Sequence, residues 1–324
     1  MQTNTITIVG MRRTGISIAL ALQQGPMDFT LIGHDSDANL LHETAVTKAV
    51  DRVEADLIKA CTPADIIVLA MPSLELEATL NLIGDRIQAH TLIIDLTALK
   101  GPGIRLAREH LKDGHYIGAR PVFAAGTFTN LETDLNSARA DLFNDSVFCV
   151  MPSSEADPKV VETAVRFGEL LGSKPYFVDP LEYDQLAFGS ETIPGVAAAA
   201  LFSAVTSSMG WRDVLRFADI PFAVGTQPLD IDTEDLAYLL LSDRAAAIRS
   251  LDNYLTKLND IRRILKEGDP ELLAVYLMDL NLSRLKWLRE RSENNWDEMH
   301  SEDFEVPSLS QHFLGGLASK RKES

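Results

Sequence analysis

The fold is decided by the stretch Ile6-Thr-Ile-Val9, which runs directly into Gly10-Met-Arg-Arg-Thr-Gly15. A short run of β-branched residues is typical of a strand buried on both faces of a parallel sheet. From Thr14 to Gln24 the apolar residues instead recur at helical spacing. The stretch therefore predicts a strand, a tight glycine turn and a helix, which together form the repeating unit of an α/β fold.

This alternation of strand and helix patterns continues to about residue 180. Further short apolar runs lie at residues 29–32, 65–70, 92–95, 116–118, 146–150 and 176–178. The pattern predicts a doubly wound, Rossmann-type parallel sheet in a domain over residues 1–180. Beyond it only helical spacing is found, so residues 181–291 are predicted to form an all-helical dimerisation or substrate domain. The polar residues 292–324 are expected to form a tail.

Composition and charge exclude several functions. The 324 residues carry 30 Lys and Arg against 47 Asp and Glu, which gives a formal charge of −17. This negative field repels phosphate backbones and anionic lipids, so we expect neither a nucleic-acid partner nor a membrane. The chain start shows no export signal, and the apolar stretch Val196–Val205 is too short to span a bilayer. Two cysteines cannot form a disulfide framework, which predicts a cytoplasmic protein.

The glycine turn carries most of a dinucleotide-binding fingerprint. Gly10 and Gly15 stand between a predicted strand and a predicted helix, and Asp35 ends the second strand 20 residues after Gly15. A carboxylate at that position accepts the ribose hydroxyls and repels a 2′-phosphate, so NAD is favoured over NADP. The cofactor-binding candidates are Gly10, Met11, Arg12, Arg13, Gly15, Asp35, Met71 and Pro72.

Position 12 departs from the fingerprint, because Arg12 stands where a glycine lets the backbone approach the pyrophosphate. Three interpretations follow. The side chain swings outward and pairs with the phosphates, or it fills the site and leaves a purely structural sheet, or the turn is an ordinary strand–helix connection. The sequence leaves these three open, and with them the question of whether NAD binds.

Further blocks follow in order along the chain: Asp65-Ile-Ile-Val-Leu-Ala-Met-Pro72, Ile94-Asp-Leu-Thr-Ala-Leu-Lys-Gly101, Tyr116-Ile-Gly-Ala-Arg-Pro121 and Trp211-Arg-Asp-Val-Leu-Arg-Phe-Ala218. In their order and spacing these blocks resemble the prephenate dehydrogenase family, and the likeness covers roughly residues 5–290. Members of that family oxidatively decarboxylate prephenate or arogenate in tyrosine biosynthesis and pass a hydride to NAD or NADP. The resemblance implies an oxidoreductase with a nucleotide-binding domain and a helical dimer domain.

The resemblance also reveals departures at the positions where cofactor and substrate meet. The family's Gly-Gly-His-Pro block supplies a histidine base, and Arg120 stands there in this sequence. A guanidinium cannot accept a proton near neutral pH. The serine that supports the histidine is Ala98 here, and both histidines of the family's His-Leu-Pro-His block are replaced, by Glu191 and Gly195. We therefore expect the fold to be kept and the ancestral reaction to be lost or altered.

The candidate catalytic residues are Arg120, as an anion contact, and Glu191, as a replacement base. The resemblance makes Thr97, Lys100 and Arg216 the substrate-binding candidates for a small carboxylate. Structural alternatives stand beside three of these roles. Arg216 can belong to a surface ion pair, Lys100 to a solvated turn, and Glu191 to a favourable contact with a helix N-terminus. The seven histidines lack metal-ligand spacing, so no metal is expected.

Two functions follow from these observations. The first is an NAD-dependent dehydrogenase that acts on prephenate or a related carboxylate. The second is a non-catalytic protein of the same fold that binds a small anion or regulates a partner. A homodimer is expected in both cases, because an apolar stripe in the helical domain exceeds what that domain can bury alone. The stripe comprises Leu236, Leu239, Leu240, Ile248, Leu251, Leu255 and Leu258.

Overall fold

The computed structural model describes residues 4–128 and 137–293, which divide into two compact units. The first unit contains residues 4–123 and 137–248, and the second contains residues 124–128 and 249–293. The predicted boundary after residue 180 lies inside the first unit, because the helices that follow it pack against elements of the sheet domain. Nearly all of the predicted tail, residues 294–324, lies outside the described residues.

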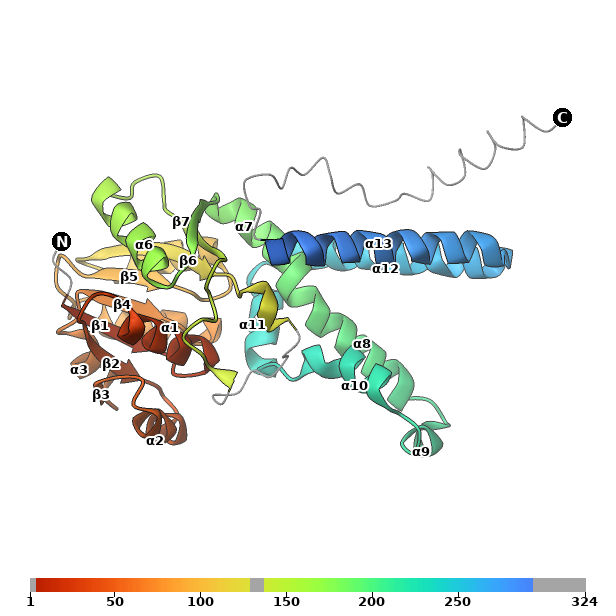
Figure 1. The fold of residues 1–324 in the computed structure, drawn as a ribbon, viewed down its shortest axis with the longest axis horizontal. Helices are drawn as coiled ribbons and strands as arrows, with labels where there is room; N and C mark the ends of the chain where they lie inside the picture. Colours follow the sequence, from red (N-terminus) through yellow and green to blue (C-terminus); the bar gives the residue numbers. More distant parts are fainter. Residues whose placement is uncertain (1–3, 129–136, 294–324) are drawn as a thin grey trace. The chain divides into compact units, whose positions relative to one another are not determined.

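The first unit is built on a sheet that has eight strands among the described residues, in the order β3-β2-β1-β4-β5-β6-β7-β8 (Figure 1). The strands are β1 (Thr5–Val9), β2 (Thr30–His34), β3 (Arg52–Val53), β4 (Ile66–Leu69), β5 (Leu92–Asp95), β6 (His115–Pro121), β7 (Val147–Met151) and β8 (Lys174–Phe177). Strands β6 and β7 pair antiparallel, and the other neighbours pair parallel. The predicted doubly wound, Rossmann-type sheet is confirmed. Its strand order reverses between β1 and β4, where such sheets place a ligand crevice at the carboxyl ends of the strands.

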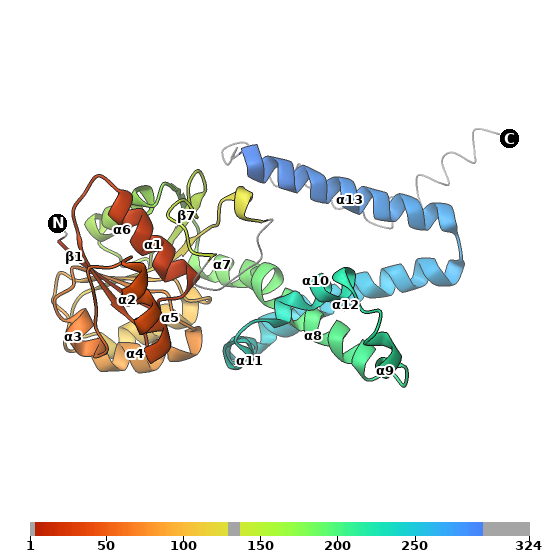
Figure 2. The same ribbon diagram turned by 60° about the horizontal axis from the view of Figure 1, so that its bottom comes forward.

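Helices cover both faces of this sheet (Figure 2). They are α1 (Arg13–Gln24), α2 (Ala38–Thr47), α3 (Leu57–Cys61), α4 (Leu76–Ile83), α5 (Lys100–His110) and α6 (Pro158–Leu170). Successive side chains of β1 alternate between the faces: Ile6 and Ile8 join the core under α1 and α6, whereas Val9 joins the core under α4 and α5. The strands are therefore apolar on both faces, which is why they appear as continuous apolar runs in the sequence.

One long helix follows the sheet. Helix α7 (Pro180–Ala187), a π-helical turn (Phe188–Thr192) and α8 (Ile193–Thr206) run on without a break. In the part of the chain that the structure describes, this 27-residue helix is the one long and apolar enough to cross a membrane by length and composition, and 28% of its apolar window is buried. The expectation that the apolar stretch Val196–Val205 is too short to span a bilayer is corrected, because the helix that contains this stretch also includes α7 and the π turn.

Three shorter helices complete the first unit: α9 (Trp211–Val214), α10 (Ile220–Thr226) and α11 (Thr233–Ser242). Asp232 caps α11 by accepting the backbone N–H groups of Glu234 and Asp235. On the inner face of α11, Leu239 packs with Leu99, which precedes α5. This contact brings α11 onto the carboxyl edge of the sheet.

The second unit is a helical hairpin. Helices α12 (Arg244–Glu267, whose first residues belong to the first unit) and α13 (Pro270–Glu293) are joined at Gly268, whose φ of +70° favours glycine. Near the turn, Ile264 and Tyr276 form a small buried cluster. Elsewhere the hairpin exposes large apolar side chains, namely Leu255, Leu258, Leu265, Leu277, Met278, Leu282 and Leu285.

Candidate active site

The glycine turn is held by contacts between backbone atoms. Gly10 has a φ of +99°, and a Cβ on it would lie 2.5 Å from the carbonyl carbon of Ala70. A Cβ on Gly15 would lie 2.0 Å from the carbonyl oxygen of Gly10. Neither neighbour is a flexible side chain that could move aside, so both positions require glycine. The N-terminus of α1 is thereby fixed at the carboxyl ends of β1 and β4.

Asp35 ties this turn to the end of β2. Its carboxylate accepts the backbone N–H of Met11 at 2.7 Å and that of Asp37 at 2.9 Å. A carboxylate offers about four acceptor positions, so two more hydrogen bonds can still be accepted. Met11 itself has a fully buried side chain and contributes only backbone to the turn.

A pocket of about 560 Å³, which we term the turn pocket, opens beside the turn. It is lined by Val9, Gly10, Arg12, His34, Asp35, Ser36, Asp37, Ala55, Leu57, Ala70, Met71, Pro72, Leu74, Glu75, Ala78, Thr79 and Leu82. Its charge is mainly negative, with Asp35, Asp37 and Glu75 against Arg12. Burial raises the pKa of Glu75, the Asp35 carboxylate adds to this shift, and Arg12 opposes it.

The two arginines of the turn take different positions. Arg12 is exposed and lines the turn pocket, whereas Arg13 is buried with its guanidinium 5.1 Å from the centre of the Phe123 ring. A cation over an aromatic face is a favourable contact in the protein interior. Among the cofactor-binding candidates, Arg13 is therefore turned into the core, and Gly10, Arg12, Asp35, Met71 and Pro72 line the pocket.

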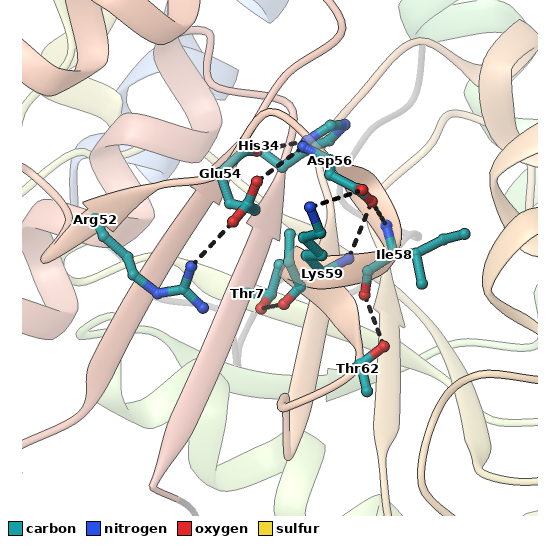
Figure 3. A network of polar contacts seen from close by, with 9 residues as sticks. Thr7, His34, Arg52, Glu54, Asp56, Ile58, Lys59 and Thr62 are labelled. Atoms are coloured by element: carbon teal, nitrogen blue, oxygen red, sulfur yellow. Dashed lines mark hydrogen bonds and ion pairs between the residues drawn. The ribbon is translucent and has the colours of Figure 1, made fainter.

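The far wall of the turn pocket is braced by a polar network that the sequence did not reveal (Figure 3). The Nδ1 of His34 lies 2.8 Å from the carbonyl oxygen of Glu54, and the Glu54 carboxylate accepts the Asp56 N–H at 3.0 Å. Asp56 in turn caps α3 by accepting the N–H groups of Ile58 and Lys59, and the Lys59 N–H contributes most to the lowered pKa of Asp56. These bonds fix the loop that supplies Ala55 and Leu57 to the pocket.

A second pocket of about 190 Å³ adjoins the first, because Ala70 and Met71 line both. We term it the β5–β6 pocket, after the two strands whose ends form it. Its other lining residues are Thr14, Ser73, Leu96, Thr97, Ala98, Arg120, Pro121, Phe123 and Asp235. The Thr97 hydroxyl is buried and has no hydrogen-bond partner within the described residues. Asp235 comes from α11, and sequence reasoning missed it because nothing in its neighbourhood marks it.

Arg120 and Glu191 form an ion pair at the edge of this pocket. The Nη2 of Arg120 lies 3.0 Å from Oε2 of Glu191, and the Tyr183 hydroxyl donates to Oε1 of Glu191 at 3.1 Å. The Glu191 charge raises the pKa of Arg120 still further above its usual value. The two candidate catalytic residues are thus brought together, and each is engaged by the other. Glu191 lies in the π turn, and its carboxylate contacts Arg120 and Tyr183, so the expected alternative of a contact with a helix N-terminus is not what the structure shows.

Lys100 is fully buried behind the pocket and lines neither cavity. Its Nζ donates to the carbonyl oxygens of Asp95, at 3.0 Å, and Thr97, and lies 3.9 Å from the Asp95 carboxylate. Burial lowers the pKa of Lys100, and the Asp95 charge works against this shift. The alternative that Lys100 belongs to a solvated turn is therefore wrong. Its ammonium links the end of β5 to the turn that follows this strand, and we term it the buried brace.

Asp184 links the long helix to this brace. Its carboxylate accepts the N–H of Lys100 at 2.6 Å and that of Gly101 at 2.8 Å, which caps the N-terminus of α5 from α7. Burial raises the pKa of Asp184 despite these bonds. The cap explains how Glu191, further along the same helix, is held at the end of β6.

Arg216 lies away from both pockets. Its side chain is 80% exposed, and its guanidinium lies 3.1 Å from the carboxylate of Asp213, which belongs to α9, whereas Arg216 lies in the turn after that helix. This geometry agrees with a surface ion pair, and the substrate-binding role stays a prediction. Within residues 4–128 and 137–293, no group of three His, Cys, Asp or Glu side chains is arranged to hold a metal.

The chain is similar to a set of dehydrogenases. A family model described as prephenate dehydrogenase, nucleotide-binding domain, matches residues 18–177. A cyclohexadienyl dehydrogenase of Zymomonas mobilis is 19% identical over 86% of this chain and 94% of its own length, and a prephenate dehydrogenase of Lactococcus lactis is 22% identical over 83% and 73%. The crystal structure of prephenate dehydrogenase from Aquifex aeolicus with hydroxyphenyl propionate and NAD+ has a TM-score of 0.76 at 17% identity, covering 88% of this chain and 99% of that one. Synechocystis arogenate dehydrogenase has a TM-score of 0.66 at 21% identity, covering 87% and 99%.

The buried brace yields a stability prediction. Lys100→Met keeps a long side chain but leaves the Asp95 carboxylate buried without its cation, which is expected to cost about 3–5 kcal/mol of unfolding free energy. Because burial lowers the pKa of Lys100, the unfolded chain binds this proton more tightly than the folded one. The stability of the wild type relative to Lys100→Met should therefore rise as the pH approaches the ordinary lysine pKa of about 10.4.

Urea unfolding at pH 7 and at an alkaline pH measures both effects. Lys59→Met is the matched control, because Lys59 is 72% exposed in its ion pair with Asp56 and its loss should change little. Equal losses in the two variants would show that Lys100 is not a buried brace.

Proposed function

The chain belongs to the prephenate dehydrogenase family, and we propose that it binds NAD in the turn pocket and acts as an oxidoreductase whose reaction differs from that of its relatives. The observation that carries the proposal is the turn pocket itself, which lies at the strand reversal with the glycine geometry and the acidic residue of a dinucleotide site. Such crevices are the usual ligand sites of doubly wound sheets.

The residues present fit NAD. Two acceptor positions left on Asp35 match the two ribose hydroxyls, and the N-terminus of α1 points at the turn where a pyrophosphate would lie. Pro72, Leu74 and Leu82 supply an apolar wall suited to an adenine ring. When bound, NAD would supply hydride acceptance. The negative charges around the pocket disfavour a further phosphate, which supports NAD over NADP.

The position of Arg12 supports the first of its three interpretations. Its side chain is exposed and borders an open pocket, so the cation is available to pair with phosphates without filling the turn. Glu75 lines the same pocket, and the Arg12 charge works against the burial that raises the pKa of Glu75.

The ion pair between Arg120 and Glu191 at the β5–β6 pocket supports a reaction that differs from that of the relatives. Arg120 has no lone pair with which to accept a proton, and the Glu191 carboxylate is committed to Arg120 and to the Tyr183 hydroxyl. A small carboxylate that enters the pocket would meet Arg120 as its cationic contact. The same engaged pair favours the second candidate function, a non-catalytic protein that binds a small anion or regulates a partner.

Cofactor binding tests the proposal directly. NADH should bind the wild type, and Arg12→Ala should weaken binding about tenfold through loss of a charge-assisted hydrogen bond. Fluorescence titration measures both, with Arg86→Ala, an exposed arginine paired with Asp85, as the control. Tighter binding by Arg12→Gly would show instead that Arg12 obstructs the site, and absence of binding in every variant would refute a nucleotide site.

A measurement of turnover distinguishes the two candidate functions, a dehydrogenase and a non-catalytic binding protein. With prephenate and NAD we expect a rate about 10²–10⁴-fold below that of a histidine-bearing relative, because general base catalysis is missing. The appearance of NADH absorbance at saturating substrates measures this rate. A rate comparable to the relative's would contradict the altered reaction, and no turnover by a chain that binds NADH would favour the non-catalytic function.

We propose further that the chain forms a homodimer through its helical part. Of the predicted stripe, Leu236 and Leu239 are buried within the first unit, whereas Ile248, Leu255 and Leu258 are about half exposed. Exposed apolar side chains are found on α8 of the first unit, at Leu201 and Phe202, and separately on α13 of the second unit. Exposed apolar side chains in this number are typical of an interface, and a two-fold pairing closes such an interface without forming a fibre. A cytoplasmic location belongs to the same proposal, since Cys61 and Cys149 are buried and not joined by a disulfide.

Sedimentation of the full chain at micromolar concentration should therefore give the mass of a dimer. The double variant Leu255→Lys with Leu258→Lys should shift the equilibrium to monomer, because two desolvated charges would face the partner. Val46→Lys is the control, since this side chain is 71% exposed on α2. A wild-type monomer, or a double variant that still dimerises, would contradict the assignment.

A further inference from the structure

A further cavity lies at the edge of the sheet opposite the two pockets described above. It has a volume of about 690 Å³ and opens at the amino ends of the parallel strands β1, β4 and β6, where Ile6, Ile66 and His115 line it. We term it the amino-edge pocket. Its other lining residues are Met27, Phe29, Asp157, Lys159, Val160, Glu162, Thr163, Arg166, Phe167 and Leu170. The turn pocket and the β5–β6 pocket share none of these residues, so the amino-edge pocket is a separate cavity.

The floor of the amino-edge pocket is apolar. Ile6, Ile66 and Phe167 are buried members of the core under α1 and α6. Phe29, which precedes β2, packs against this core but is only partly buried, and Met27 is 50% exposed. The core is therefore open at this edge of the sheet. A flat ring system bound there would remove apolar surface from water and would contact the aromatic rings of the floor.

The rim of the amino-edge pocket carries a cation without a counter-ion among the described residues. Arg166 is paired with Glu162, and the Asp157 carboxylate caps α6 by accepting the backbone N–H of Lys159 at 2.8 Å. The Lys159 ammonium itself has no Asp or Glu within ion-pair distance in residues 4–128 and 137–293. The half-buried imidazole of His115 likewise makes no hydrogen bond within that part of the chain. Both side chains can donate to an anionic group.

We propose that the amino-edge pocket is a ligand site for a small molecule that combines a flat apolar ring system with one anionic group. The rings of Phe29 and Phe167 contact the ring system, and Lys159 and His115 contact the anion. A chain with a formal charge of −17 repels anions in general, so binding of such a ligand depends on this local arrangement. The site lies beyond the proposed function, and neither its ligand nor its test depends on NAD.

A matched pair of probes tests the proposal. 2-Naphthoate and 2-naphthamide have the same ring system, and only the naphthoate is an anion. Calorimetry on the full chain should show that 2-naphthoate binds about threefold to tenfold more tightly than 2-naphthamide, as expected for one charge-assisted contact at a partly exposed site. Equal binding of the two probes, tighter binding of the amide, or binding of neither would overturn the proposal.

The variant Thr163→Trp locates the probe. The Thr163 hydroxyl donates to the Lys159 carbonyl oxygen of its own helix at 2.8 Å, so a tryptophan there fills the pocket at little cost to the fold. The variant should bind 2-naphthoate at least about tenfold more weakly than the wild type. Thr256→Trp is the matched control, because the Thr256 hydroxyl makes the same bond, to Asp252 at 2.8 Å, on exposed α12. Undiminished binding by Thr163→Trp would place the probe elsewhere and refute the site.

The variant Lys159→Gln tests the anion contact and does not disturb the core, because Lys159 is exposed. The affinity for 2-naphthoate should fall to that for 2-naphthamide, whereas the affinity for the amide should stay as in the wild type. Lys112→Gln is the control, since the Lys112 side chain is 72% exposed and lies outside the pocket. A preference for the anion that survives in Lys159→Gln would contradict the assigned contact and overturn the proposal.

Discussion

The rest of the site depends on the close packing of backbone against backbone at the turn between β1 and α1. The space between Gly10 and Gly15, and between Gly10 and Ala70, leaves no room for a side-chain atom. Because the turn is so close, the N-terminus of α1 lies beside the ends of β1, β2 and β4, and the carboxylate of Asp35 can reach the Met11 amide. Both pockets open around the elements that this packing fixes.

Much of the fold could be predicted from the sequence, because strands buried on both faces leave continuous apolar runs. The strand β3 could not, since Arg52 and Val53 pair over only two residues and show no such run. Within the site, the candidates of the glycine turn lie around one pocket because they are close in sequence. The burial of Lys100 could not be predicted, because the sequence shows a cation next to Gly101 but does not show that helix α7 packs over it.

Asp235 shows the other limit of sequence reasoning. It lies 161 residues from Leu74, and only the packing of α11 brings the two together. Arg120, expected as an anion contact, and Glu191, expected as a replacement base, are likewise far apart in sequence. The structure shows that they are better understood as one unit, in which each charge supplies the other's partner.

That mutual dependence constrains how this chain can change. Replacement of Arg120 alone would leave Glu191, which is only 30% exposed, without its counter-charge, and replacement of Glu191 alone would do the same to Arg120. Energetically coupled positions of this kind do not respond additively to substitution. A substitution at position 120 or 191 alone is therefore expected to lower stability, whereas a substitution of both residues together can avoid that loss, so the ion pair constrains the two positions to change as a pair.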